Sequence, residues 1–88
     1  MHSLVKVTVA DFDQFMDGIK ASQPLRDKYG VSITAIYRLQ SNENQLFIVS
    51  EYKDEESANN YFNSDELAAA MKQSSIISEP EMWKVNKV

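Results

Sequence analysis

Four consecutive apolar residues, Leu46-Phe47-Ile48-Val49, constrain the fold of this 88-residue chain more than any other feature. They begin a segment, residues 46–52, whose β-branched and aromatic side chains are typical of a strand. Because successive strand side chains point to opposite faces of a sheet, this strand is apolar on both faces, and each face needs a cover. A chain of this length buries only about 60–65% of its unfolded surface, so it has few residues with which to cover both faces of the strand.

The rest of the chain alternates between the periodicities of helices and strands. After the N-cap Asp11, apolar residues at i, i+3, i+4 and i+7 mark the inner face of a first helix: Phe12, Phe15, Met16 and Ile19. Pro24 is expected to end this helix, and Gly30 to stop one further turn. Asp54 and Ser64 are expected to cap the two parts of a second, kinked helix.

Strands are predicted at residues 4–9, 31–39, 46–52 and 82–88. The polar link SNEN, residues 41–44, joins the second and third strands as an antiparallel hairpin. Together with the helices, the order is βαββαβ. This order predicts one α+β domain over residues 1–88 with the ferredoxin-like fold, in which two helices cover one face of a four-stranded antiparallel sheet.

The pairing register of the hairpin decides which side chains face the helices. A loop centred on Glu43–Asn44 places Tyr37 and Tyr52 on the helix side, and Trp83 is expected on the same side. The helix-free face then carries, among others, Leu4, Ile36, Arg38, Phe47, Val49, Glu51 and Met82. A bulge in any strand would exchange part of these assignments.

The helix-free face predicts a homodimer. Its apolar side chains form too large a patch to leave in water, and pairing with the same face of a second copy is the commonest way to cover it. Arg38 and Glu51 lie one diagonal step apart and are expected to pair across the strands. We therefore expect a sheet-to-sheet dimer whose interface includes Arg38, Phe47, Val49 and Glu51.

Composition excludes several classes of function. The chain has no cysteine, so disulfides, thiolate metal sites and cysteine nucleophiles are excluded. Its net charge is −4 and its nine basic residues are scattered, which argues against a nucleic-acid partner. No apolar run approaches the ~18 residues of a membrane span, and no secretory signal is visible, so no membrane association is expected and cytoplasm is the default location. His2, the single histidine, gives no metal-ligand spacing, and we expect no metal and no other cofactor.

The segment FIVSEYKDEESANNYFNSDELAAAM, residues 47–71, resembles the dimeric α/β-barrel superfamily, in particular small proteins of the antibiotic-biosynthesis-monooxygenase type. The shared pattern is an apolar strand that ends at Glu51-Tyr52, an acidic cap, Ala58, the aromatic pair Tyr61-Phe62 and a restart at Ser64 to Leu67. The upstream Arg26, Tyr29, Gly30 and Val31, which enter the second strand, also fit.

The resemblance implies a sheet-to-sheet dimer with a ligand pocket between the sheet and the helices of each subunit. Some members are cofactor-independent monooxygenases that act on phenolic or quinone-like substrates. Others degrade haem or cyclise polyketides, and those activities use histidines. The lone terminal His2 therefore disfavours them. The shared motifs are motifs of the fold, and they assign no catalytic residue.

Two functions remain open. In the first, the chain binds a flat aromatic or quinone-like molecule between sheet and helices, with a cofactor-independent monooxygenase as its narrower form. The candidate pocket residues, whose hydroxyls and indole N–H would orient the ligand, are Tyr37, Tyr52, Tyr61 and Trp83. In the second, these side chains are packed core, and the chain is a non-catalytic ligand-binding or self-assembly module.

The pair formed by Glu51 and Arg38 also has two interpretations. One is a general base with an electrophilic partner. The other is a structural ion pair that fixes the register at the dimer interface. We favour the ion pair, because a carboxylate beside a cation keeps a low pKa and makes a poor base near neutral pH.

Overall fold

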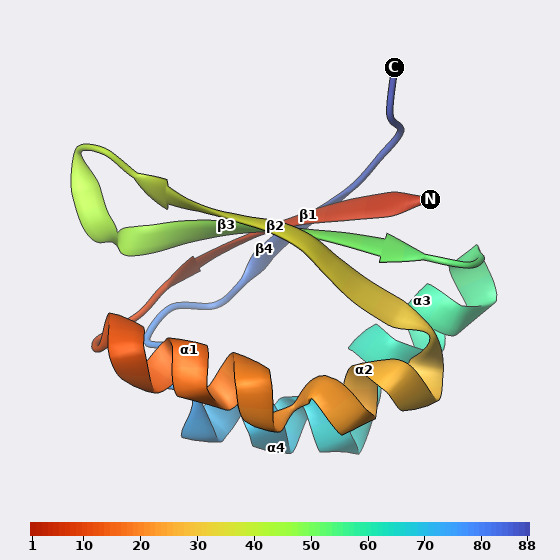
Figure 1. Cartoon of the computed structure of the whole chain (residues 1–88), viewed down its shortest axis with the longest axis horizontal. Helices are drawn as coiled ribbons and strands as arrows, with labels where there is room; N and C mark the ends of the chain where they lie inside the picture. Colours follow the sequence, from red (N-terminus) through yellow and green to blue (C-terminus); the bar gives the residue numbers. More distant parts are fainter.

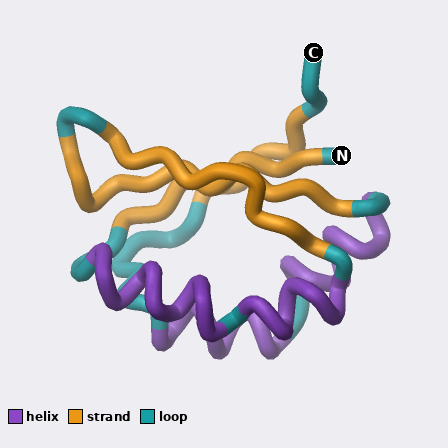
Figure 2. Tube along the Cα trace, in the orientation of Figure 1, coloured by secondary structure: helices purple, strands orange, loops and turns teal.

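The computed structural model describes residues 1–88 and confirms the α+β, ferredoxin-like fold. One antiparallel sheet has the strand order β2-β3-β1-β4 and is built from β1 (His2–Thr8), β2 (Val31–Leu39), β3 (Asn42–Tyr52) and β4 (Glu81–Val85). The strands that are neighbours in the sheet include β1 and β3, which are far apart along the chain. Figures 1 and 2 show a layer of helices beneath one face of this sheet and no helix on the other face.

Each of the two predicted helices is divided into two segments. The four segments are α1 (Phe12–Ala21), α2 (Gln23–Tyr29), α3 (Glu55–Phe62) and α4 (Asp65–Gln73). Pro24 lies in the first turn of α2, where its missing N–H would have no helical partner, so it begins a helix instead of only ending one. Gly30 ends α2 with a left-handed φ of 69°. None of the four has the length and hydropathy required to cross a membrane.

The N-caps predicted from the sequence are present. The Asp11 carboxylate accepts a hydrogen bond from the backbone N–H of Gln14 at 3.0 Å. Ser64 Oγ accepts one from the N–H of Leu67 at 3.1 Å, and this starts α4 directly after α3. Each cap satisfies an N–H that the first turn of a helix leaves without a partner.

The register of the β2–β3 hairpin differs from the prediction. The turn lies at residues 40–41, earlier than the predicted centre, and the register shifts again between Ile33 and Ala35. As a result Tyr37 pairs with Phe47, and Arg38 pairs with Leu46. Directly paired residues share a face, so Tyr37 lies on the helix-free face and Arg38 on the helix side. The predicted faces of both residues are wrong, and so is that of Ile36, which pairs with Ile48 and packs against the core. The irregularity between Ile33 and Ala35 reverses the side chains from Ala35 to Arg38.

The faces of β4 are also reversed relative to the prediction. Met82 pairs with Val5, which faces the helices, and Trp83 pairs with Leu4, which does not. On the helix side, Lys84 Nζ donates to Glu55 Oε1 at 2.8 Å. Trp83, Lys84 and Val85 alternate as a strand with Trp83 and Val85 facing inward would, but all five residues of β4 are exposed, so this alternation does not mark a buried face.

The core consists of two groups of buried side chains. One packs β1 and β3 against α1 and contains Val7, Val9, Phe15, Leu46 and Ile48. The other lies near the N-terminal end of β2 and contains Val31, Tyr52, Ala58 and Tyr61. Together they hold the helical layer against the sheet and leave a hollow between the two layers.

Candidate functional site

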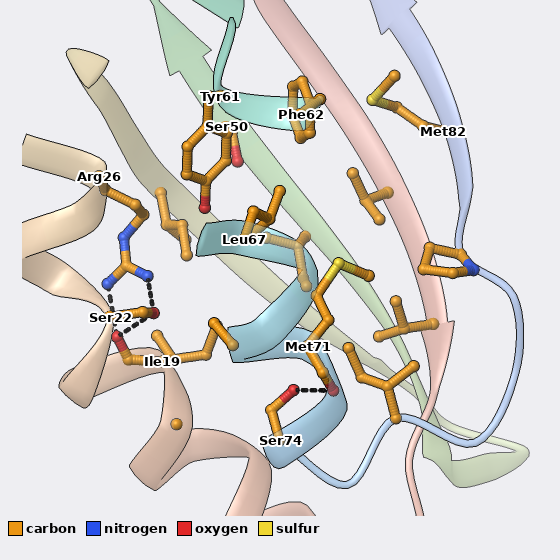
Figure 3. Close-up of a pocket in the computed structure, with 18 of the residues that line it drawn as sticks. Ile19, Ser22, Arg26, Ser50, Tyr61, Phe62, Leu67, Met71, Ser74 and Met82 are labelled. Atoms are coloured by element: carbon orange, nitrogen blue, oxygen red, sulfur yellow. Dashed lines mark hydrogen bonds between the residues drawn. The ribbon is translucent and has the colours of Figure 1, made fainter. Parts of the chain in front are cut away.

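A cavity of about 340 Å³ lies between the sheet and the helices (Figure 3). Strands β1, β3 and β4 contribute Val5, Ile48 and Met82, and helix α4 contributes Met71 from the opposite layer. Thirteen of the twenty lining residues are apolar. The volume falls within the roughly 300–1,000 Å³ of small-molecule sites, and a mostly apolar wall with a few polar groups is typical of such sites.

Of the four aromatic residues predicted to line such a cavity, only Tyr61 does so. Tyr52 is buried on the helix side, but its hydroxyl donates to the carbonyl of His2 at 3.0 Å, so it is part of the packed core. Tyr37 and Trp83 lie on the helix-free face, where they are 62% and 46% exposed. These three residues do not contribute to the cavity, which corrects the predicted pocket.

The four predicted interface residues are also only partly brought together. Phe47, Val49 and Glu51 lie on the helix-free face. Arg38 lies on the helix side, with its guanidinium 3.9 Å from the centre of the Phe12 ring and its Nε donating to the Glu43 carbonyl at 2.9 Å. The predicted Arg38–Glu51 ion pair is therefore wrong, and so is the general-base arrangement that depended on it.

One wall of the cavity carries a buried guanidinium. Arg26, in α2, is 3% exposed. Its Nη1 donates to Ser22 Oγ at 2.7 Å, and its Nη2 donates to the Ile19 carbonyl at 2.6 Å and to Gln23 Oε1 at 3.1 Å. Its Nε is buried and has no hydrogen-bond partner. All three acceptors are neutral groups, so the positive charge of Arg26 has no carboxylate beside it.

Tyr61 and Ser50 add hydroxyl groups to the lining of the same cavity. In Figure 3 the Tyr61 hydroxyl points into the cavity on the side of Arg26, and no hydrogen bond joins either hydroxyl to another residue drawn there. Burial raises the pKa of the Tyr61 hydroxyl, and nearby Arg26 opposes this shift. The cavity thus combines two hydroxyl groups and a cation with a mainly apolar lining.

The floor of the cavity depends on a close approach of α1 and α4. A Cβ atom added to Gly18 would lie 3.0 Å from Ser74 Cβ, well inside the usual carbon–carbon contact distance. Ser74 is itself held by a hydrogen bond from its Oγ to the Met71 carbonyl at 3.0 Å. Glycine at position 18 lets the two helices pack at this distance.

Arg26 and Ser22 also line the cavity, and they are not among the site residues predicted from the sequence, although a signal for them exists. The inner positions of the first helix continue from Phe15 and Ile19 to Ser22 and Arg26 at spacings of four, three and four. Pro24 predicts an end to this stripe, but α2 begins at Gln23, two residues after the end of α1, so the stripe continues. Ser50 carried no comparable signal, because an isolated serine in an apolar strand is common.

The other candidate binding sites on the molecule are weaker than this cavity. An open hollow of about 470 Å³ lies between α1 and α4, but six of its nine lining residues are not hydrophobic. No three histidine, aspartate or glutamate side chains lie close enough together to share a metal ion. The cavity between the sheet and the helices is therefore the strongest candidate site.

Comparisons with known proteins support the fold. No protein-family model and no curated protein matches the sequence. Among solved structures, a proposed antibiotic biosynthesis monooxygenase from Bordetella bronchiseptica is similar at a TM-score of 0.81 and 15% identity, over 99% of this chain and 95% of that one. A second, from Caulobacter crescentus CB15, has a TM-score of 0.76 at 13% identity, over 99% of this chain and 88% of that one.

A third similar structure is SnoaB, a cofactor-independent oxygenase from Streptomyces nogalater. Its TM-score is 0.74 at 10% identity, over 99% of this chain and 93% of that one. The structural neighbours are thus antibiotic-biosynthesis-monooxygenase-like proteins, which agrees with the resemblance read from residues 47–71. At these identities the similarity establishes the shared fold.

Proposed function

We propose that this protein binds a small, mainly apolar, ring-containing molecule in the cavity between sheet and helices. The observation that carries the proposal is the 340 Å³ space itself, which a packed interior would not contain. Its apolar wall provides the binding energy, and Arg26, Ser50 and Tyr61 provide groups that orient a ligand. Met71 and Met82 are flexible side chains that adjust to a ligand's shape.

The narrower form of this proposal is a cofactor-independent monooxygenase acting on an aromatic or quinone-like compound. The fold shared with the oxygenase SnoaB supports it, although fold alone does not determine activity. In such a reaction the electron-rich ring of the substrate itself reacts with oxygen. Oxygen consumption with a panel of hydroquinones and polycyclic phenols tests this form, and no turnover above the buffer rate across the panel would argue strongly against it.

Binding itself is tested with a cavity-filling variant. Ala70 in α4 lines the cavity, whereas the neighbouring Ala69 is exposed and does not. We expect Ala70→Phe to abolish the thermal stabilisation that aromatic compounds give the wild type, because a ligand that binds the native state raises its stability. Ala69→Phe, the matched control, should retain it. Equal stabilisation of both variants would place binding elsewhere.

We also propose that the helix-free face forms a homodimer. One row of side chains crosses all four strands on this face, and it consists of Ala35, Val49, Leu4 and Trp83. The next row brings Tyr37 beside Phe47. In the observed register Tyr37 and Trp83 replace Arg38 and Met82 on this face, and Ala35 replaces Ile36, so the face remains largely apolar. A second copy of the same face is the simplest cover for it.

Light scattering at micromolar concentration tests the dimer. We expect a mass of twice the 10.1 kDa chain. Phe47→Asp should shift the protein to the monomer, because it places a charge within the proposed interface. Ile77→Asp is the matched control, since Ile77 is an exposed apolar residue outside the sheet and its change should leave the mass unaltered. A wild-type monomer would leave the sheet face free and favour the interaction module.

A further inference from the structure

The most unusual group in the molecule is Arg26, a buried cation without a counter-ion. Moving a charge out of water costs several kcal/mol unless an opposite charge or good hydrogen bonds compensate for it. The chain has 13 acidic residues, but its three ion pairs join other residues. Compensation for Arg26 comes from Ser22, Gln23 and the Ile19 carbonyl.

These contacts leave the guanidinium incompletely satisfied. The Ile19 carbonyl lies near the C-terminal end of α1, where a helix carries only partial negative charge. The Nε of Arg26 is buried and donates to nothing. A purely structural role, fastening α2 to the end of α1, explains the two Nη groups but not the free Nε or the position of the side chain on the cavity wall.

The surroundings of Arg26 fit an anionic oxygen group. Tyr61 and Ser50 add hydroxyls that donate hydrogen bonds, and both line the same cavity. No aspartate or glutamate lines the cavity, so nothing there would repel a negative charge. A guanidinium as deeply buried as that of Arg26 forms stronger hydrogen bonds with an anion than it would in water.

Apart from Ser22, Asn63 and Ser74, the remaining lining of the cavity is mainly apolar, and it extends away from Arg26. Arg26 belongs to α2, which contacts the β2 edge of the sheet, whereas Met82 lies on β4 at the opposite edge. Figure 3 shows the two side chains on opposite sides of the cavity, with Leu67 between them. A ligand that fits this distribution has a charged group at one end and an apolar body at the other.

We propose that the ligand of this cavity is an amphipathic acid, whose carboxylate or ionised phenol binds Arg26, Tyr61 and Ser50 and whose apolar ring system extends toward Met82. This inference rests on the proposed function, because it names the chemical class of the molecule that the cavity holds. The bound anion supplies the negative charge that Arg26 lacks in the free protein.

The test compares matched charged and neutral probes by isothermal titration calorimetry. The first pair is 2-naphthoate and 2-naphthamide, and the second is a nitro-substituted naphthol that is ionised at neutral pH and its methyl ether. We expect at least one anion to bind about tenfold or more tightly than its neutral partner, as hydrogen bonds to charged groups predict. Preference for naphthoate alone identifies a carboxylate, and preference for the naphthol alone identifies an ionised phenol.

The variant Arg26→Met should remove this preference while neutral probes still bind. Arg38→Met is the matched control, because Arg38 is the only other arginine and does not line the cavity; its preference for anions should persist. Arg26→Lys, which keeps the charge, should retain part of it. Since Arg26 also holds the Ile19 carbonyl, circular dichroism checks the fold of each variant, and the wild-type comparison needs no variant.

The outcomes separate the two proposals. Equal affinity of anions and neutral probes overturns the inference and leaves ligand binding in the cavity intact. An anion preference that survives in folded Arg26→Met overturns the role of Arg26. Failure of all four probes to bind the wild type overturns the inference together with the proposed function.

Discussion

The close approach of Gly18 and Ser74 leads to a prediction with opposing terms. Replacing glycine by alanine within a helix ordinarily stabilises it by about 1 kcal/mol. Here, however, the new Cβ would lie 3.0 Å from Ser74 Cβ and 3.6 Å from Ser74 Cα. Favourable carbon contacts lie near 3.5–4.0 Å, and overpacking of this kind costs about 1–3 kcal/mol.

Ser74 has little freedom to move away. It is buried, its Oγ is bonded to the Met71 carbonyl, and the next residue, Ser75, has a positive φ of 70°. We therefore expect the packing cost to cancel or exceed the helical gain, so that Gly18→Ala changes the free energy of unfolding by between zero and a loss of about 2 kcal/mol.

Urea denaturation of a double-mutant cycle measures this directly. In a Ser74→Gly background the opposing Cβ is absent, and there Gly18→Ala should stabilise by about 1 kcal/mol. A gain of that full amount in the wild-type background would refute the reasoning, because it would mean that the α1–α4 contact yields without cost.

Three further predictions concern individual contacts. Tyr52→Phe should lower the free energy of unfolding by about 1 kcal/mol, because the buried hydroxyl donates to the His2 carbonyl; an unchanged denaturation midpoint would contradict it. Ser64→Ala should lower the free energy of unfolding by about 1 kcal/mol through loss of the α4 N-cap, and it should speed amide hydrogen exchange in α4. Unchanged exchange rates in α4 would contradict this. The hydrogen bond from Lys28 lowers the pKa of Glu66 below its ordinary value of 4.5. A carboxylate whose pKa is lower in the folded than in the unfolded state stabilises the fold at pH values above the unfolded pKa, and this stability is lost as pH falls through the folded pKa. The melting-temperature difference between wild type and Glu66→Gln should therefore shrink on acidification and in high salt. A difference that grows toward low pH would refute this sign.

The fold could be predicted because several independent signals in the sequence agree. The caps at Asp11 and Ser64, the helical stripe that includes Phe15 and the β-branched strands all favour the same element order, and the structure has it. Local signals of this kind depend on neighbouring residues, so a single sequence contains them.

The faces of the strands could not be predicted as reliably, because they depend on pairing between strands. A shift of one residue reverses every side chain beyond it, and the irregularity in β2 near Ala35 did so for Tyr37 and Arg38. The predicted pocket is the least accurate part of the prediction, since three of its four aromatic residues do not line the cavity.

The group that most distinguishes the cavity, Arg26, was hidden for a different reason. A charged residue after Pro24 resembles an exposed turn, and only the packed structure shows that the guanidinium is buried. The one-domain extent, the cytoplasmic location and the lack of a cofactor remain predictions.

The most direct test of the account is a backbone amide NMR titration of the wild-type protein with 2-naphthoate. We predict that shift changes will gather around the cavity, at residues such as Gly18, Ser50 and Met71 on its three walls. Changes confined to Tyr37 and Trp83 on the helix-free face, or no changes at saturating probe, would contradict the claim that the interior of this protein is its binding site.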